Sequence, residues 1–269
     1  MESLPFLQLS QGHLQILETC PRKFQSVFLD NLTLPQPSLA SEKQELGKQF
    51  HQLMQQRALG LEIQPLLDDS PKLQGWFQHF QDSPPPLIAG GFRQSEYQCT
   101  LTLEGFTLTA VFDLLIQNGD RAQIADWKTY RRPLRAQILQ QHWQTRLYLF
   151  IAAEVLGYIP DRISMVYWFA ESIPEDSNPA QNWLSIPYSE SMHQQTRETL
   201  TKLLGSLRQW MQDFTTKHQS FPQAPLSAQK CWSKTQCCPF VTHCHRTPDS
   251  ATDLEDLTNL GAIAEVSLD

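Results

Sequence analysis

The residues that could do chemistry lie on two predicted strands joined by a tight turn. The first strand, 110–116, is apolar except for Asp113, and the second, 122–128, carries Asp126 and Lys128 two positions apart. Because side chains alternate along a strand, Asp126 and Lys128 point to the same face of a sheet. Two carboxylates and one amine at a strand end are typical of a divalent metal site with a neighbouring cation that stabilises negative charge.

The turn decides whether Asp113 joins that face. Asn118-Gly119 accepts positive φ at both positions and predicts a two-residue hairpin loop. With that loop, Asp113 lies opposite Ile124 and shares a face with Asp126, one diagonal step away. A three-residue loop would reverse the parity and place Asp113 on the other side of the sheet. The predicted site therefore depends on one register.

Three further polar residues lie on predicted helices. His51 lies beside the apolar stripe of a helix predicted over 42–59, while Gln144 and Tyr148 share one face of a helix predicted from after Pro133 to about 156. Each alone is an ordinary helix residue, and a histidine at the edge of a core is more often structural than a ligand. Asp113 alone is equally explained by a salt bridge, since a buried acid is costly unless it is paired or metal-bound. Only the combination indicates a site.

The order of these residues resembles the PD-(D/E)xK nuclease superfamily, and within it the RecB-type nuclease domains and the related CRISPR adaptation nucleases. The resemblance extends from Cys20 to Cys244 and rests on four motifs, which are Gly47-x-x-Phe50-His51, Asp113 in an apolar strand, Asp126-x-Lys128 and Gln144-x-x-x-Tyr148. One departure is Ala110, where the family usually has a glycine, and this affects strand packing rather than a ligand.

The resemblance implies a metal-dependent DNA nuclease. His51, Asp113, Asp126 and the carbonyl of Trp127 would bind Mg²⁺ or Mn²⁺, since oxygen ligands with one imidazole suit these ions. Lys128 would orient the attacking water or stabilise charge on the phosphorane. Gln144 and Tyr148 would hold the substrate near the metal, and four arginines would contact DNA phosphates, namely Arg131, Arg132, Arg135 and Arg146.

The cysteines form a second constellation. Cys20-Pro-Arg-Lys-Phe and Cys238-Pro-Phe-Val-Thr-His-Cys244 resemble the iron–sulfur staple of the same nucleases, in which one N-terminal and three C-terminal thiolates hold a [4Fe–4S] cluster. The resemblance implies Cys20, Cys231, Cys238 and Cys244 as ligands. Cys231 replaces the family's usual Cys-x-x-Cys partner, because Thr235 occupies the expected place.

Several alternatives stay open for these cysteines. Cys237 competes with Cys238 for the third position, although the Cys-Pro-Phe context favours Cys238. A zinc site that uses His243 or His245 would also fit the composition, as would a set of free thiols. Cys99, within a predicted strand, is expected to be a small core residue.

The remaining pattern predicts an α/β fold with a restriction-endonuclease-like core, in which helices flank a central mixed sheet. Glu104-Gly105 predicts a second hairpin between strands 92–103 and 106–116, and a crossover helix precedes a buried strand at 162–170. Residues 1–246 are expected to form one nuclease domain whose ends the cluster joins, from Cys20 to Cys231–Cys244. Residues 247–269 are expected to be a flexible acidic tail.

Composition limits the class of protein. The chain has 269 residues, of which 41% are hydrophobic and 18% charged, as in ordinary globular proteins. No stretch approaches the ~20 apolar residues of a membrane span, and the N-terminus does not resemble a signal peptide. We therefore expect a cytoplasmic protein without membrane contact, in which cysteines indicate metal or redox chemistry. The net charge of −7 argues against a protein that binds nucleic acid over its whole surface, but it is compatible with a local basic groove.

The function expected from these features is an exonuclease acting on single-stranded DNA ends, in repair and recombination or in CRISPR adaptation. The sequence contains no Gly-x-x-x-x-Gly-Lys-Ser/Thr loop, so a helicase or the CRISPR adaptation proteins would be separate partners. The alternative is a catalytically silent iron–sulfur subunit that binds DNA or scaffolds a helicase–nuclease complex. Retention of Asp113, Asp126 and Lys128 argues against that alternative. A zinc-stapled structural protein is the third hypothesis.

Overall fold

A computed structural model describes residues 8–32, 38–131, 136–171, 182–226, 231–232 and 237–246, without the side chains of 38–41 and 136. The predicted tail, 247–269, and two of the predicted DNA contacts, Arg132 and Arg135, lie outside these residues. None of the helices in the described ranges combines the length and apolar character needed to cross a bilayer.

The centre of the structure is a six-stranded mixed sheet. Its strands are β1 (Gln8–Leu9), β2 (Phe92–Leu103), β3 (Phe106–Asn118), β4 (Arg121–Arg131), β5 (Ile163–Glu171) and β6 (Trp183–Pro187). β3 pairs antiparallel with β2 and with β4, β5 lies parallel to β4, and β6 returns antiparallel to β5. The parallel β4–β5 pair is the crossover that the sequence predicted, so the α/β class is confirmed.

Both predicted hairpins are present, and one has a shifted loop. Leu103 pairs with Phe106, so Glu104 and Gly105, both with positive φ, form the first loop as predicted. In the second hairpin Asn118 pairs with Arg121, so the loop is Gly119-Asp120 and not the predicted Asn118-Gly119. Gly119 supplies the positive φ at the first loop position, which is where a type II′ turn requires glycine.

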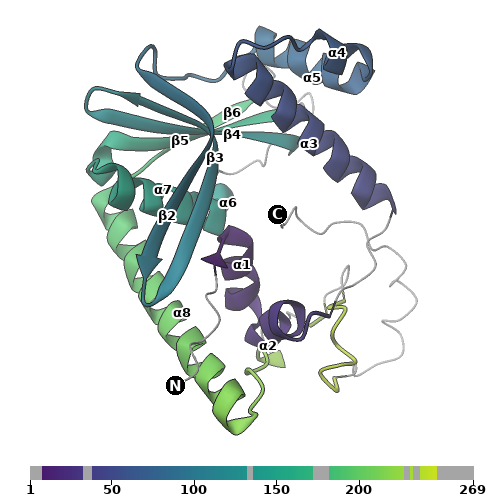
Figure 1. The fold of residues 1–269 in the computed structure, drawn as a ribbon, viewed down its shortest axis with the longest axis vertical. Coiled ribbons are helices and arrows are strands. Elements are labelled where there is room, and N and C mark those ends of the chain that lie inside the picture. Colours follow the sequence, from purple (N-terminus) through teal and green to yellow (C-terminus); the bar gives the residue numbers. More distant parts are fainter. Residues whose placement is uncertain are drawn as a thin grey trace.

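Helices cover both faces of the sheet (Figure 1). After β1 come α1 (Gln11–Thr19), α2 (Pro21–Phe24) and the π-helical turn Gln25–Leu29. Before β2 follow α3 (Ser38–Ala58), α4 (Gln64–Asp68) and α5 (Pro71–Asp82), which group at the other end of the molecule in Figure 1. Between β4 and β5 lie α6 (Ala136–Gln141), α7 (Trp143–Leu156) and the short helix Pro160–Arg162, and α8 (Glu190–Lys217) follows β6.

The single long helix predicted between Pro133 and residue 156 is two helices. His142 has extended backbone dihedrals and separates α6 from α7. The break is stabilised by a side chain, because the Thr145 hydroxyl donates a hydrogen bond to the Leu139 carbonyl at 2.5 Å and contacts the Tyr167 hydroxyl at 2.7 Å. The end of α7 is as predicted, with Gly157 in the left-handed conformation.

Two hydrophobic cores lie on the two faces of the sheet, and strand β3 contributes to both. Leu108, Ala110 and Phe112 belong to the core shared with α1, α7 and α8, whereas Leu114 and Ile116 belong to the core shared with α3, α4 and α5. Regular alternation would keep all five even-numbered residues on one face. The facing of β3 therefore switches at Asp113, between the two cores.

Candidate active site

Asp113 lies where β3 and β4 separate. The last paired residues of the two strands are Leu114 and Ala125, and the same register continued by one residue would set Asp113 opposite Asp126. Past this point the Trp127 N–H donates a 2.6 Å hydrogen bond to Asp113 Oδ2 instead of to a strand carbonyl. The predicted register was therefore wrong by two residues along β4, since it set Asp113 opposite Ile124.

His51 reaches the same carboxylate from helix α3. Phe50, Leu53 and Met54 anchor that helix in the second core, and the Phe50 ring stacks on Trp168 at 5.6 Å. This anchoring places His51 Nδ1 3.3 Å from Asp113 Oδ1. Burial lowers the pKa of His51, but the charges of Asp113 and Asp126 outweigh burial and raise it to about 9. Without a metal, this histidine is therefore a cation paired with Asp113.

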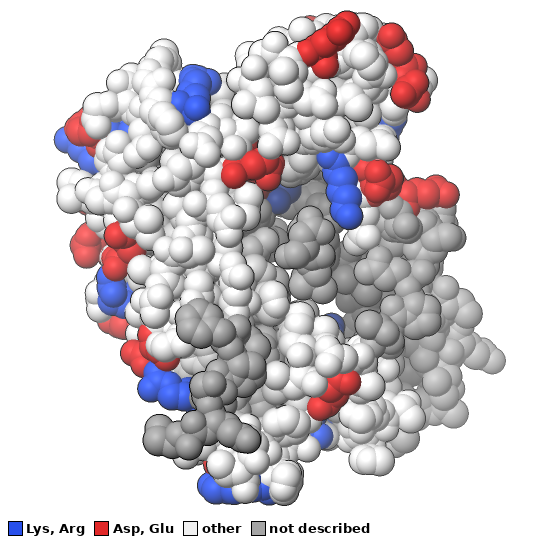
Figure 2. Space-filling model, viewed as in Figure 1, with Lys and Arg blue, Asp and Glu red and all other residues white. Residues whose placement is uncertain are grey.

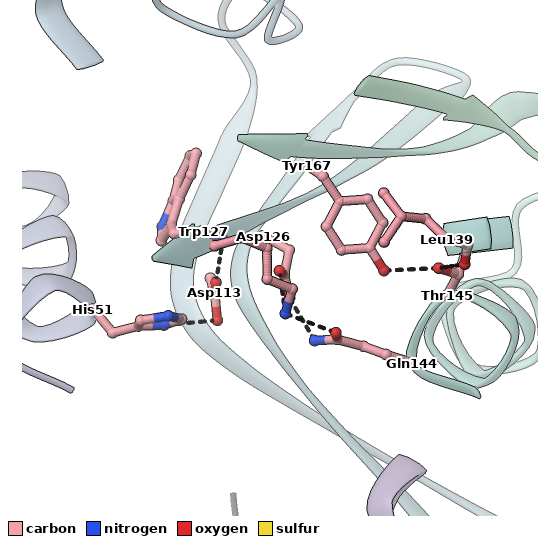
Figure 3. A network of polar contacts seen from close by, with 9 residues as sticks. His51, Asp113, Asp126, Trp127, Leu139, Gln144, Thr145 and Tyr167 are labelled. Atoms are coloured by element: carbon pink, nitrogen blue, oxygen red, sulfur yellow. Dashed lines mark hydrogen bonds and ion pairs between the residues drawn. The ribbon is translucent and has the colours of Figure 1, made fainter. Parts of the chain in front are cut away.

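Asp126 and Lys128 form a buried ion pair, and Asp126 points toward Gln144 of α7, away from His51 (Figure 3). Lys128 Nζ lies 2.8 Å from Asp126 Oδ2 and donates a 2.8 Å hydrogen bond to Gln144 Oε1. The Gln144 amide in turn donates to Asp126 Oδ1 at 2.5 Å. Burial raises the pKa of Asp126 to about 6 against the opposing effect of Lys128. Burial lowers the pKa of Lys128, but Asp126 outweighs it and raises that pKa above its ordinary value.

One oxygen of this ion pair can accept a second partner. Asp126 is 1% exposed, and its Oδ2 lies 2.8 Å from the Lys128 ammonium. A carboxylate oxygen has two lone pairs, so this oxygen can also accept a metal ion.

Helix α7 supplies the remaining candidates. Gln144 links Asp126 to Lys128, and the buried Tyr148 hydroxyl interacts with Gln144, with burial followed by the charge of Asp126 raising the pKa of that phenol. Arg146 is largely covered, because it lies 4.1 Å from the Trp143 ring and 3.9 Å from Glu18. Arg131 is exposed at the end of β4.

Glu96 is a neighbour that the sequence motifs did not indicate. Ligand atoms of His51, Glu96 and Asp113 all lie within 4.8 Å of one another, and in the described ranges they are the group with metal-binding spacing. Asp126 is outside that group, and its carboxylate faces Gln144 in Figure 3 and is paired with Lys128. The sequence did contain a signal for Glu96. The Glu104-Gly105 loop fixes the register of β2 against β3, and that register, continued along both strands, sets Glu96 opposite Asp113.

The cysteines gather where α2 packs against the segment that follows α8. Cys20 precedes α2, and Arg22 in that helix donates hydrogen bonds to the carbonyls of Pro222 and Phe221 at 3.0 and 2.8 Å. Burial raises the pKa of Cys244, and the neighbouring thiols Cys20 and Cys238 raise it further. Cys231 is next to Cys238, whose N–H donates to the Cys231 carbonyl at 2.7 Å.

These sulfur atoms do not have the spacing of a zinc site. Within the part of the chain that the structure describes, no three cysteine and histidine ligand atoms lie within 4.8 Å of one another. A tetrahedral zinc ion brings its ligands closer together, since Zn–S bonds are about 2.3 Å and Zn–N bonds about 2.0 Å long. Cys99 is a core residue, as predicted, with 3% exposure.

The comparisons with known proteins agree with this geometry. The family model described as "PD-(D/E)XK nuclease superfamily" matches residues 8–245. No curated protein matches. A solved structure of a "Putative exonuclease" from Eubacterium rectale is 12% identical over 92% of each chain, with a TM-score of 0.48. The structure of a protein called SSO0001 is 14% identical over 76% of this chain and 79% of that one, with a TM-score of 0.34. These two likenesses are too distant to bear on function. The family match covers the helix, the hairpin and the crossover that bring His51, Asp113, Asp126 and Lys128 together, and the chain belongs to the PD-(D/E)XK nuclease superfamily.

Proposed function

We propose that this nuclease cleaves DNA with a Mg²⁺ or Mn²⁺ ion held by His51, Asp113, Asp126 and the carbonyl of Trp127. The observation that carries the proposal is the proximity of two largely buried carboxylates, one 3.3 Å from an imidazole and one 2.8 Å from an ammonium. A group of carboxylates with one imidazole suits a hard divalent ion. The Trp127 carbonyl is on the same edge of β4 as the N–H that reaches Asp113, because both groups of one strand residue point the same way.

The ion would polarise the scissile phosphate and lower the pKa of the attacking water. Lys128 would donate to the oxygen on which negative charge develops, and its position is fixed beforehand by Asp126 and Gln144. Because its pKa is raised, Lys128 stays charged at neutral pH and acts as a hydrogen-bond donor and a charge.

Gln144 and Tyr148 would position the substrate and the lysine together. Gln144 already uses its carbonyl on Lys128 and its amide on Asp126, so its first effect is to orient these two groups. Arg131, which is exposed, is the described arginine most open to a DNA phosphate, whereas Arg146 is partly neutralised by Glu18. On the face shown in Figure 2, Lys and Arg side chains are scattered among Asp and Glu, so DNA binding would rest on a few local contacts.

We further propose that the substrate is a single-stranded DNA end. The sequence has no nucleotide-binding loop, so a motor that exposes such ends would be another protein, either a helicase or a component of CRISPR adaptation. Repair, recombination and CRISPR adaptation are the processes in which such an activity would serve.

A [4Fe–4S] cluster on Cys20, Cys231, Cys238 and Cys244 is the second part of the proposal. In a cubane each thiolate binds a different iron, so the sulfurs are more widely spaced than the ligands of a single ion. Of the two adjacent cysteines, Cys238 has a thiol whose pKa is raised by burial and then by the nearby thiols of Cys20 and Cys231. The pKa of the Cys237 thiol is raised by burial and by Cys231, and this thiol donates to the Cys238 carbonyl at 3.7 Å. This supports Cys238 as the ligand. The cluster would be structural, joining the two ends of the chain.

The test is a nuclease assay on the full-length protein purified without oxygen. End-labelled and end-blocked single and double strands are incubated with Mg²⁺, Mn²⁺ or EDTA, for the wild type, Asp113→Asn and Asp126→Asn. The exposed Asp161→Asn is the matched control. We expect both site variants to lose at least about a hundredfold in rate, since the ion supplies several kcal/mol and 1.36 kcal/mol is tenfold. Full activity of both variants, or DNA binding without cleavage under every metal, would refute the proposal.

A further inference from the structure

Glu96 in strand β2 is the side chain at the site that the proposed function does not use. Its carboxylate, a carboxylate oxygen of Asp113 and an imidazole nitrogen of His51 lie within 4.8 Å of one another. We propose that Glu96 is a further protein ligand of the divalent ion, so that β2, β3 and α3 hold it jointly. This inference rests on the proposed metal-dependent function.

The backbone at Glu96 departs from regular strand geometry. Its φ is +50°, which is rare for a residue with a side chain and is found here in the middle of a strand. Ser95 pairs with Leu114 and Tyr97 pairs with Phe112, but Glu96 and Asp113 between them are not paired. Such a conformation is strained and is usually kept where surrounding structure or function requires it. Here the unpaired position coincides with the switch of β3 at Asp113.

The charges around the site fit one divalent ion when Glu96 is included. Glu96, Asp113 and Asp126 carry three negative charges when ionised, and the Lys128 ammonium offsets one of them. A neutral, ligating His51 leaves a net charge of minus two, which one Mg²⁺ or Mn²⁺ neutralises. Without Glu96 the same ion would leave an uncompensated positive charge in a largely buried site.

Asp126 adds a buried carboxylate beside this group. It is 1% exposed, and its Oδ2 lies 2.8 Å from the Lys128 ammonium. Its charge lies near enough to act on both Glu96 and His51. A cation held by Glu96, Asp113 and His51 would therefore also be attracted by Asp126.

The experiment is a calorimetric titration of the full-length protein with Mn²⁺ alone, which measures metal binding and does not depend on cleavage. The variants are Glu96→Gln, Glu96→Asp and Asp113→Asn. Glu104→Gln is the matched control, because Glu104 is a glutamate with φ of +53° in the loop at the far end of β2. We expect Glu96→Gln to weaken Mn²⁺ binding about 10- to 100-fold, a range typical of residues that support a metal site, and Glu104→Gln to leave it unchanged.

Glu96→Asp separates a ligand from a nearby charge. It keeps the negative charge but withdraws the carboxylate by one methylene, so a ligand predicts weaker binding and a mere charge predicts wild-type affinity. Circular dichroism of the metal-free variants checks that each is folded. If Glu96→Gln does not fold, Glu96→Asp still tests the inference. Wild-type affinity in both Glu96 variants, with binding lost in Asp113→Asn, would overturn this inference and leave the proposed function intact. Wild-type affinity in Asp113→Asn as well would overturn the proposed function itself.

Discussion

Replacing Lys128 by methionine tests the buried ion pair most directly. The substitution removes one positive charge and keeps a side chain of similar length. Lys128 is 12% exposed, lies 2.8 Å from both Asp126 Oδ2 and Gln144 Oε1, and its ammonium is 5.6 Å from the Tyr167 ring. Methionine can satisfy none of these contacts, so a buried carboxylate and a buried amide oxygen each lose their donor.

The expected cost follows from what remains in the site. Breaking a buried ion pair by removing one partner destabilises a protein by about 3–5 kcal/mol. Asp126 can limit this cost by taking up a proton, because its pKa is already about 6 with the lysine in place and rises when the lysine is lost. We therefore expect a loss near the lower end, about 3 kcal/mol in the free energy of unfolding.

The assay is urea unfolding in EDTA at pH 7.5, with Lys72→Met as the matched control. Lys72 is 56% exposed, and its ion pair with Glu171 spans 3.8 Å, so this variant should stay within about 0.5 kcal/mol of the wild type. The cleavage rate of Lys128→Met should fall about 10²- to 10³-fold, as for loss of a donor to developing charge. If the two lysine variants were equally stable, Lys128 would not be held in a buried pair and the reasoning would be wrong.

Three other predictions concern stability and the cysteines. Gly91→Ala should destabilise the protein by about 2–3 kcal/mol in urea unfolding, because φ is +78° and a Cβ would overlap the Gln117 carbonyl oxygen. Gly75→Ala, on the exposed face of α5, should instead stabilise the protein by about 0.5–1 kcal/mol. Equal effects of the two substitutions would contradict this prediction. Burial lowers the pKa of His13, whose Nδ1 accepts a hydrogen bond from the N-cap of α1, so the unfolded chain binds a proton more readily. Stability should therefore fall as the pH drops below about 6.5, and less steeply in His13→Gln; an unchanged slope would exclude this cause. A brown sample purified without oxygen should lose its visible absorbance in Cys238→Ser and keep it in Cys237→Ser, and a colourless wild type would count against the cluster.

Local sequence signals predicted several elements of the fold. The helix predicted to end at about residue 156 does end there, before Gly157, and Glu104-Gly105 forms the predicted hairpin loop. Each of these signals acts through backbone groups within a few residues, so no distant contact can easily override it. The same locality explains why the strands before and after each loop were found at nearly their observed positions.

The register of the second hairpin was predicted with the wrong loop. The loop is Gly119-Asp120 and not Asn118-Gly119, which shifts every β3–β4 pair by two residues. Because side chains repeat every two residues, a shift of two by itself keeps each side chain on its face. The switch of β3 at Asp113 is a second and separate departure from the predicted alternation.

Features produced by distant contacts were not predictable from the sequence. The break at His142 depends on a hydrogen bond from Thr145 and a contact with Tyr167 in another strand. The distortion at Glu96 depends on how β2 meets β3 at the switch between the two cores. The residue types at these two positions do not indicate a break in a helix or a distortion of a strand, since neither glycine nor proline is involved.

The switch at Asp113 explains how two helices on opposite faces of the sheet serve one site. In a regularly alternating strand, the side chain of Asp113 would face one core, and a helix from the other face could not reach it. Because β3 changes its facing at this residue and β4 separates from it there, His51 of α3 reaches Asp113 from one side while Gln144 of α7 reaches Asp126 from the other. The acids thus divide, with Asp113 on the imidazole side and Asp126 on the lysine side. Each acid has its own cation, the imidazole of His51 for Asp113 and the ammonium of Lys128 for Asp126.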